Sequence, residues 1–160
     1  MLAWILPGVG HLQNIHPLVV HYPVALLTGA VALYWIAWVT RRDSVALVAL
    51  WMLVLGTASA AVAIGTGLYA APGVMLALSV KHRLLVYHEW LMLGVGGLSA
   101  GLTLWALAAR PMPTRLRVLF LSLTLVLAGL VARGADYGGR MVYDYNAGGN
   151  ACGQPIEFNQ

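Results

Sequence analysis

Charged residues are scarce in this chain. They make up 9% of 160 residues, whereas hydrophobic residues make up 61%. An ordinary soluble domain carries about a quarter charged residues, so the composition excludes that class and indicates an integral membrane protein. The single cysteine, Cys152, permits no internal disulfide. No nucleophile is paired with a recognisable general base, and we do not expect a hydrolytic enzyme.

Four apolar stretches are long enough to cross a hydrocarbon core of about 30 Å, which takes about 20 helical residues. Backbone groups in lipid must form hydrogen bonds within their own segment, so we expect helices. Arginines and prolines interrupt the stretches, and prolines end helices. We therefore predict an all-α fold, an integral membrane four-helix bundle. The expected spans are residues 17–39, 44–69, 84–109 and 116–132.

The remaining segments differ from the spans in composition. The start, MLAWILPGVG, has no basic region and is broken by Pro7 and Gly8, so it does not match a signal peptide. We expect it to be a short interfacial segment. After Arg133 the chain is rich in Gly, Tyr and Asn, which is typical of loops. The expected division is a membrane domain at 1–134 and an extramembrane tail at 135–160.

Basic residues indicate the orientation in the membrane. Five arginines flank the two short connections: Arg41, Arg42, Arg110, Arg115 and Arg117. Four basic residues lie at the opposite helix ends: Lys81, Arg83, Arg133 and Arg140. The side with more basic residues is expected to be cytoplasmic. This places the protein in a bacterial inner membrane as a multi-pass protein, with both termini and the tail in the periplasm.

The histidines all lie at one end of the predicted spans. His11, His16 and His21 surround the start of the first span, and His82 and His88 surround the start of the third. Imidazole near a bilayer is costly, so two clusters at matching depth indicate a ligand shared by both helices. His16 and His21 are separated by about 140° around a helix and cannot share one axial position.

The depth of these histidines favours a haem. His21 and His88 each lie about one turn inside their helices, as axial ligation by two helices of a bundle requires. The chain lacks C-x-x-C-H, so the haem would be of the b type. We predict His21 and His88 as axial ligands. His16 and His82 are second-choice ligands, whose other roles are to bind propionates, cap helices or line a quinone site. One haem is expected, and two is the alternative.

Other residues near this end fit the same prediction. Arg83, Arg133 and Arg140 are expected to meet haem propionates, although they would also serve as ordinary interfacial cations. The connection at 70–83 is apolar and is expected either to lie along the interface or to extend the third helix. Pro23 cannot donate to the Val19 carbonyl, so we expect a bent or loosened turn there.

Two motifs carry a resemblance to a known family. NIHPLVVHYPVALL resembles the His-Pro, then Val-His-Phe-Pro, signature of bacterial four-helix membrane proteins catalogued as a domain of unknown function. YGGRMVYDYNAGG resembles the closing Gly-Gly-x-Leu-Val-Tyr element of that family, with Met141 in place of leucine. The similarity covers Leu12 to about Gly149. It implies a cytochrome b-like protein that binds haem b and serves electron transfer.

Three functions remain open. The first is a haem b-binding electron-transfer subunit of a respiratory or photosynthetic complex, with quinone, a c-type cytochrome, or other membrane or periplasmic redox subunits as partners. The second is a structural membrane anchor without redox activity. The third is a copper-binding protein, in which imidazoles act with Met75 or Met92. We favour a non-catalytic electron-transfer or anchor subunit of an oxidoreductase complex over an independent enzyme. The chain is expected to be embedded in a lipid bilayer, and no nucleic-acid partner is expected.

Overall fold

The computed structural model describes residues 15–74, 76–145 and 147. The regular secondary structure of this part consists of helices joined by short connections. Its elements run in the order α2 (His16–Val19), α3 (His21–Thr40), α4 (Asp43–Ala70), the 3-10 turn η2 (Ala71–Gly73), α5 (Leu78–Ala109) and α6 (Arg117–Tyr143). The N-terminal segment, His11, Met75 and Cys152 lie outside the described residues. The predicted all-α membrane bundle is confirmed.

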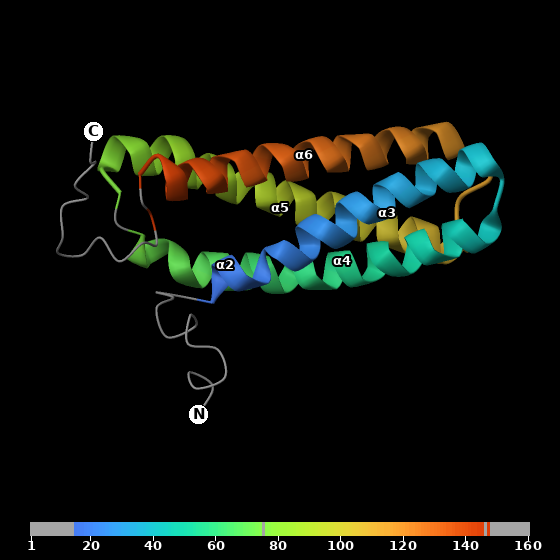
Figure 1. The fold of residues 1–160 in the computed structure, drawn as a ribbon, viewed down its shortest axis with the longest axis horizontal. Coiled ribbons are helices and arrows are strands. Elements are labelled where there is room, and N and C mark those ends of the chain that lie inside the picture. The colour runs from blue at the N-terminus through green and yellow to red at the C-terminus, as the bar shows by residue number, and fades with distance from the viewer. Residues whose placement is uncertain (1–14, 75, 146, 148–160) are drawn as a thin grey trace, which may run out of the picture.

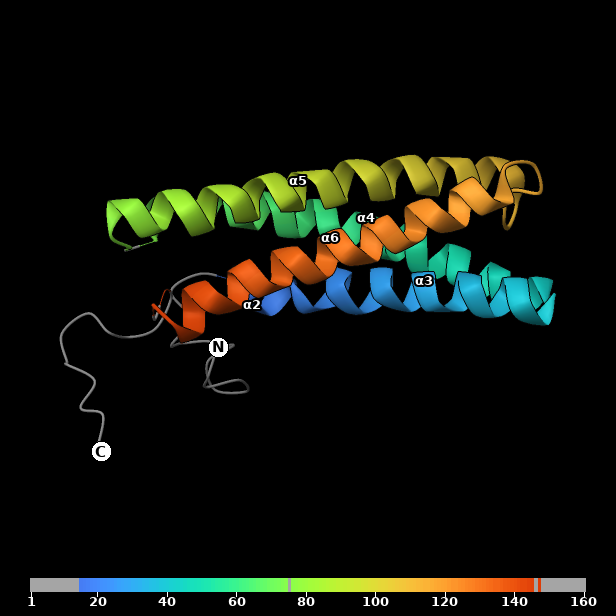
Figure 2. The same cartoon turned by 90° about the horizontal axis from the view of Figure 1, so that it is seen from above.

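The helices form an up-and-down bundle. α3 packs along α4, α4 along α5 and α5 along α6, while α6 also contacts α3 and closes the ring (Figure 1). From above, α6 runs obliquely from α5 at one end toward α3 and α2 at the other (Figure 2). The end that holds α2, η2 and the last turns of α6 is called the histidine end. The end that holds the connections at 41–42 and 110–116 is called the arginine end.

Four helical segments in the described part are long and apolar enough to cross a membrane. They are His16–Thr40, Asp43–Gly73, Leu78–Ala109 and Arg117–Tyr143, of 25, 31, 32 and 27 residues. At about 1.5 Å per residue each exceeds the roughly 30 Å that a span requires. The third begins six residues before the predicted start, so the connection at 70–83 extends the third helix.

The predicted end of the fourth helix is wrong. We expected a loop after Arg133, whereas α6 continues to Tyr143. Gly134 packs against Met92 of α5, so this glycine lets two helices approach and does not mark a turn. Ion pairs at i+3 and i+4 further support the added turns, because Arg133 pairs with Asp136 and Arg140 with Asp144, both at 3.4 Å.

The first span is divided in two. α2 ends at Val19 and α3 begins at His21, with Val20 between them. Pro23 lacks the N–H that would bond to the Val19 carbonyl, and the break falls at that turn. The result is a short helix, α2, that carries His16 separately from the rest of the span.

An aromatic cluster lies in the core toward the arginine end. Tyr34 of α3 and Phe120 of α6 are both fully buried, and their rings meet edge to face with centroids 5.0 Å apart. Trp105 of α5 also meets Phe120 edge to face, with centroids 5.6 Å apart. The Tyr34 hydroxyl donates to the Pro111 carbonyl at 3.2 Å. Phe120 therefore joins three of the four helices.

Phe120→Ala is expected to lower the free energy of unfolding by about 2–4 kcal/mol, because the vacated space cannot be refilled by rigid neighbours. Leu119→Ala is the matched control, since Leu119 is 48% exposed on the outer face of the same helix. Equilibrium unfolding in mixed micelles measures both changes. Equal losses in the two variants would contradict the packing described here.

Candidate functional site

The buried face of the first span determines which histidine points inward. Pro23, Leu27 and Ala30 are buried at spacings of four and three, the repeat of one helix face. Counting back seven residues from Pro23 reaches His16, which is half-buried. His21 lies two residues before Pro23, about 200° around the helix, and its side chain is exposed.

The same rule separates the histidines of α5. Val95, Ser99 and Leu102 are buried along one face, and His88 lies two turns before Val95 on that face. His88 is half-buried, whereas His82 is exposed. The structure thus places His16 and His88 on inward faces at the same end of the bundle and leaves His21 and His82 on the surface.

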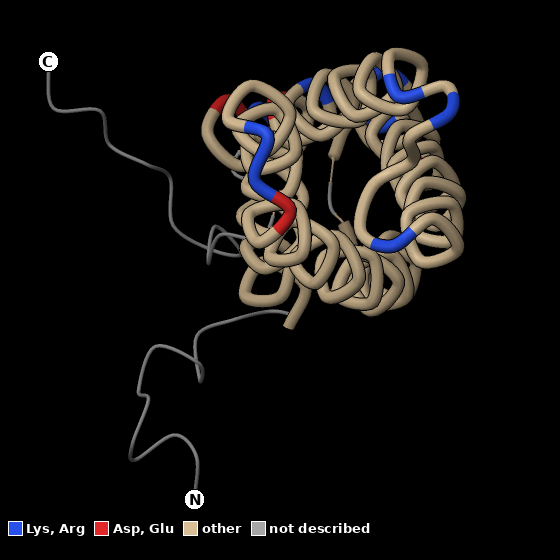
Figure 3. Tube along the Cα trace, turned by 90° about the vertical axis from the view of Figure 1, so that its right-hand side faces the viewer, with Lys and Arg blue, Asp and Glu red and all other residues tan. Residues whose placement is uncertain are grey.

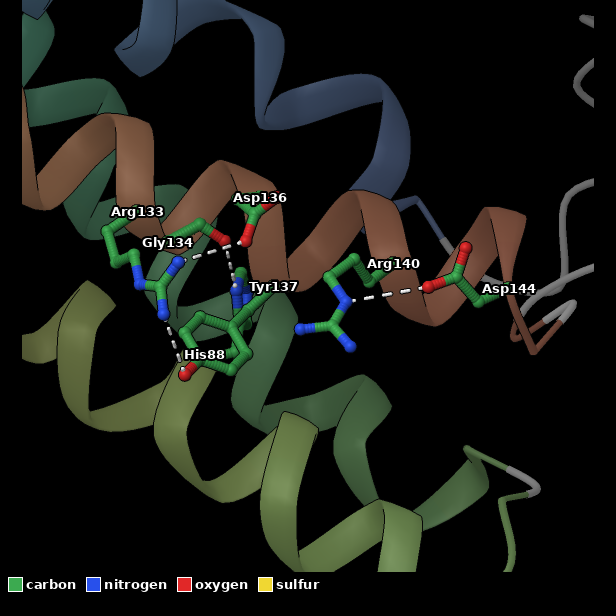
Figure 4. Close-up of polar contacts among 7 residues, drawn as sticks. All are labelled: His88, Arg133, Gly134, Asp136, Tyr137, Arg140 and Asp144. Carbon is green, nitrogen blue, oxygen red and sulfur yellow. Dashed lines mark hydrogen bonds and ion pairs between the residues drawn. The ribbon is translucent and has the colours of Figure 1, made fainter.

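The hydrogen bond made by His88 fixes its tautomer. Nδ1 of His88 lies 2.8 Å from the carbonyl oxygen of Gly134 on α6 (Figure 4). A carbonyl only accepts, so Nδ1 carries the hydrogen and donates it. The lone pair of neutral His88 is therefore on Nε2, the nitrogen that a histidine oriented in this way offers to a metal.

Thr66 and Ala63 of α4 hold the ring of His16. Nδ1 of His16 lies 3.1 Å from Oγ1 of Thr66, and the ring is also hydrogen-bonded to the backbone of Ala63. The Thr66 hydroxyl lies 3.0 Å from the Ala63 carbonyl. Each imidazole is thus anchored to a neighbouring helix, His16 to α4 and His88 to α6.

Both imidazoles pack against glycines of a neighbouring helix. A methyl group at Gly67 of α4 would lie 2.9 Å from Cε1 of His16, closer than side chains normally approach. A methyl group at Gly138 of α6 would lie 3.3 Å from Cε1 of His88. Each ring thus rests against the backbone of the neighbouring helix, and larger residues there would push it away.

Cations and aromatic rings lie beside this pair on the outer surface of α5 and α6. Arg133 pairs with Asp136, places its guanidinium carbon 4.9 Å from the centre of the Tyr137 ring, and lies 3.4 Å from the Tyr137 hydroxyl (Figure 4). Tyr137 stacks on Tyr87 with centroids 6.2 Å apart. Arg140 pairs with Asp144, and Arg83 is exposed. Propionate binding by Arg83, Arg133 and Arg140 stays a prediction.

Three residues of this site were not expected from the sequence. Thr66, Gly134 and Gly138 orient or seat the imidazoles, yet the glycines read as loop residues. Their spacing of four, in GADYGG, continues the buried stripe of Leu127 and Val131 on α6, and that continuation was the available signal. Among the described residues, no group of three or more His, Cys, Asp or Glu side chains is placed to hold a metal ion. Any metal here would depend on the two imidazoles and on other ligands.

Comparison with known proteins places the chain in a family. The family model described as "Predicted membrane protein (DUF2231)" matches residues 12–151, and the chain belongs to that family. No curated protein and no solved structure matches the chain. The family description supports a membrane protein and assigns no activity.

The tautomer of His88 is directly measurable. We expect His88 to show a protonated Nδ1 and an unprotonated Nε2 in long-range proton–nitrogen correlation spectra of ¹⁵N-histidine-labelled protein in micelles. Thr66→Val removes one hydrogen-bond partner of His16 and should change the pattern of that ring while His88 keeps its own. A protonated Nε2 on His88 in the unmodified protein would contradict the assignment.

Gly67→Ala is expected to destabilise the protein by about 1–3 kcal/mol, because the added methyl group displaces the His16 ring from Thr66. Gly65→Ala is the control, since Gly65 is exposed on the same helix and has no atom within 4 Å of an added Cβ. That change should be neutral or stabilising by up to about 1 kcal/mol. Equilibrium unfolding in micelles measures the stability of both variants. Equal effects would contradict the close packing of His16 against Gly67.

Proposed function

We propose that the protein is a haem b-binding electron-transfer subunit, with His16 and His88 as the axial ligands. The observation that carries the proposal is the shared arrangement of the two imidazoles. They lie on the inward faces of α2 and α5, and each is hydrogen-bonded to a neighbouring helix; His88 has Nδ1 engaged, so that Nε2 is its donor atom. Ligation by two histidines from different helices is a known mode of haem binding in helix bundles.

The ligand set differs from the expectation based on depth alone. His21 was predicted because it lies further along the first span, but its side chain is exposed. His16 takes its place because it lies on the inward face of the first span and is hydrogen-bonded to Thr66 of α4. His82 is exposed as well, so a second haem would lack an interior ligand from α5, and one haem is proposed.

The chain's own residues would orient the ligands and shape the pocket. Gly134 and Thr66 hold the two rings, and Gly67 and Gly138 leave room for them. Second-shell groups of this kind contribute about 10–100-fold to metal affinity. Haem, when bound, would supply one-electron redox chemistry, and the protein would supply position and a largely apolar surrounding.

The sidedness of the proposed site follows from the basic residues. The arginine end carries five arginines, against four basic residues at the histidine end, which favours the arginine end as cytoplasmic. The site then lies near the periplasmic face of an inner membrane. Exchange of electrons with quinol, with a c-type cytochrome or with another redox subunit fits that depth.

A copper site is the second candidate. Met92 lies one turn after His88, and both side chains approach Gly134 or Gly138 on α6. One thioether with two imidazoles is a donor set that suits copper. A structural anchor without a cofactor is the third candidate, in which the histidine network would serve packing alone.

The test begins with a reduced-minus-oxidised difference spectrum of the purified protein, together with iron and copper analysis. We expect sharp bands of a low-spin b-type haem. His16→Ala and His88→Ala should abolish these bands, because each removes one axial ligand. His21→Ala and His82→Ala are the matched controls, and both should keep the bands.

Each other outcome has a defined meaning. Loss of the bands in His21→Ala with retention in His16→Ala would overturn the ligand pair and favour the depth-based assignment. Copper without haem absorption would favour the copper site. Absence of both iron and copper would leave the structural anchor as the remaining candidate. Circular dichroism of each variant identifies losses that result from misfolding.

A further inference from the structure

A pocket lies at the arginine end, far from the histidines. It has a volume of about 410 Å³ and is formed by the end of α3, the start of α4, the connection before α6 and the start of α6. Its lining includes Trp38, Arg41, Arg42, Asp43, Met112 and Arg117. Figure 3 looks at this end and shows basic residues in both connections. The proposed electron-transfer function leaves this pocket unexplained.

The pocket has an excess of positive charge. It is lined by three guanidinium groups and one carboxylate, that of Asp43. The two ion pairs within the described part of the chain involve Arg133 and Arg140, which lie at the histidine end. The three arginines of the pocket are therefore not neutralised by ion pairs among the described residues. Such a surplus attracts an anion.

Arg117 is oriented by its own connection. It is half-buried, and its Nε donates to the Pro113 carbonyl at 3.3 Å. That bond uses one of the five N–H donors of a guanidinium and leaves the terminal nitrogens for a ligand. A guanidinium fixed in this way can bind two oxygens of one phosphate side by side.

Two helix N-termini meet at the same place. α4 begins at Asp43 and α6 at Arg117, and neither has a side chain bonded as an N-cap. The first turn of a helix presents backbone N–H groups and a partial positive charge of about half a unit. The start of α6 therefore adds to the attraction that the arginines exert on an anion, whereas Asp43 in the first turn of α4 offsets the dipole of that helix.

The lining also has an apolar part at the membrane boundary. Ala37, Ala46 and Met112 are buried side chains of the pocket. Trp38, at its rim, is 40% exposed, and tryptophan prefers the interface between lipid and water. The pocket thus joins a cationic surface to an apolar one where phospholipid headgroups lie.

We propose that this pocket binds a phosphate group, with Arg41, Arg42 and Arg117 as its ligands. Two sources share that chemistry, the headgroup of an anionic phospholipid and soluble phosphate. Basic pockets between membrane helices on the cytoplasmic side bind anionic headgroups in this manner. The site is independent of the histidine pair, so the failure of either proposal leaves the other standing.

Native mass spectrometry of the detergent-solubilised protein tests the lipid source, with phosphatidylglycerol as the probe and phosphatidylcholine for comparison. Calorimetric titration with inorganic phosphate tests the soluble source. Combining R41Q, R42Q and R117Q should weaken binding by at least about tenfold, because several charge-assisted hydrogen bonds are lost. R115Q is the matched control, since Arg115 lies in the same connection and does not line the pocket.

Retention of phosphatidylglycerol that depends on these arginines supports the site and assigns a lipid source. Binding of inorganic phosphate with the same dependence supports the site and assigns a soluble source. Equal binding by the triple variant and R115Q, or no binding of either probe, overturns the proposal. If the triple variant does not fold, R117K is used in its place. This variant keeps the positive charge without the planar guanidinium and should bind several-fold more weakly. Unchanged binding by R117K would then overturn the proposal.

Discussion

Every helix of this bundle must turn one face inward and the opposite face toward lipid, and the rest of the structure depends on that division. The inward face repeats every three or four residues, as Pro23, Leu27 and Ala30 show on α3. A polar side chain on that face must find its partners inside the protein. His16 and His88 fall on the inward face and are hydrogen-bonded to neighbouring helices. His21 and His82 fall outside it and are exposed.

Glycine placement follows from the same constraint. An imidazole between two helices occupies space that a side chain on the facing helix would otherwise fill. Gly67 and Gly138 face His16 and His88, and Gly134 both accepts from His88 and faces Met92. The histidine pair and these glycines therefore form one unit. Replacing an imidazole by a small residue would leave a void between the helices.

The number of spans and most of their boundaries could be predicted because long apolar runs respond to one physical requirement, the thickness of the bilayer. Which histidines lie inside could not be read from depth, because depth along a helix says nothing of direction around it. The buried stripe supplies the direction, and it would have selected His16. The end of α6 was missed because Gly134 and Gly138 look like loop residues until their partners on α5 are known.

The two ends of the bundle differ in how their charged side chains are balanced. At the histidine end Arg133 and Arg140 are each paired with an aspartate one turn away. At the arginine end a single carboxylate, Asp43, lies among three guanidinium groups of the pocket. The start of α6 adds positive potential at that end, while Asp43 in the first turn of α4 offsets the dipole of that helix. An anion from the surroundings would reduce the imbalance of charge at the arginine end.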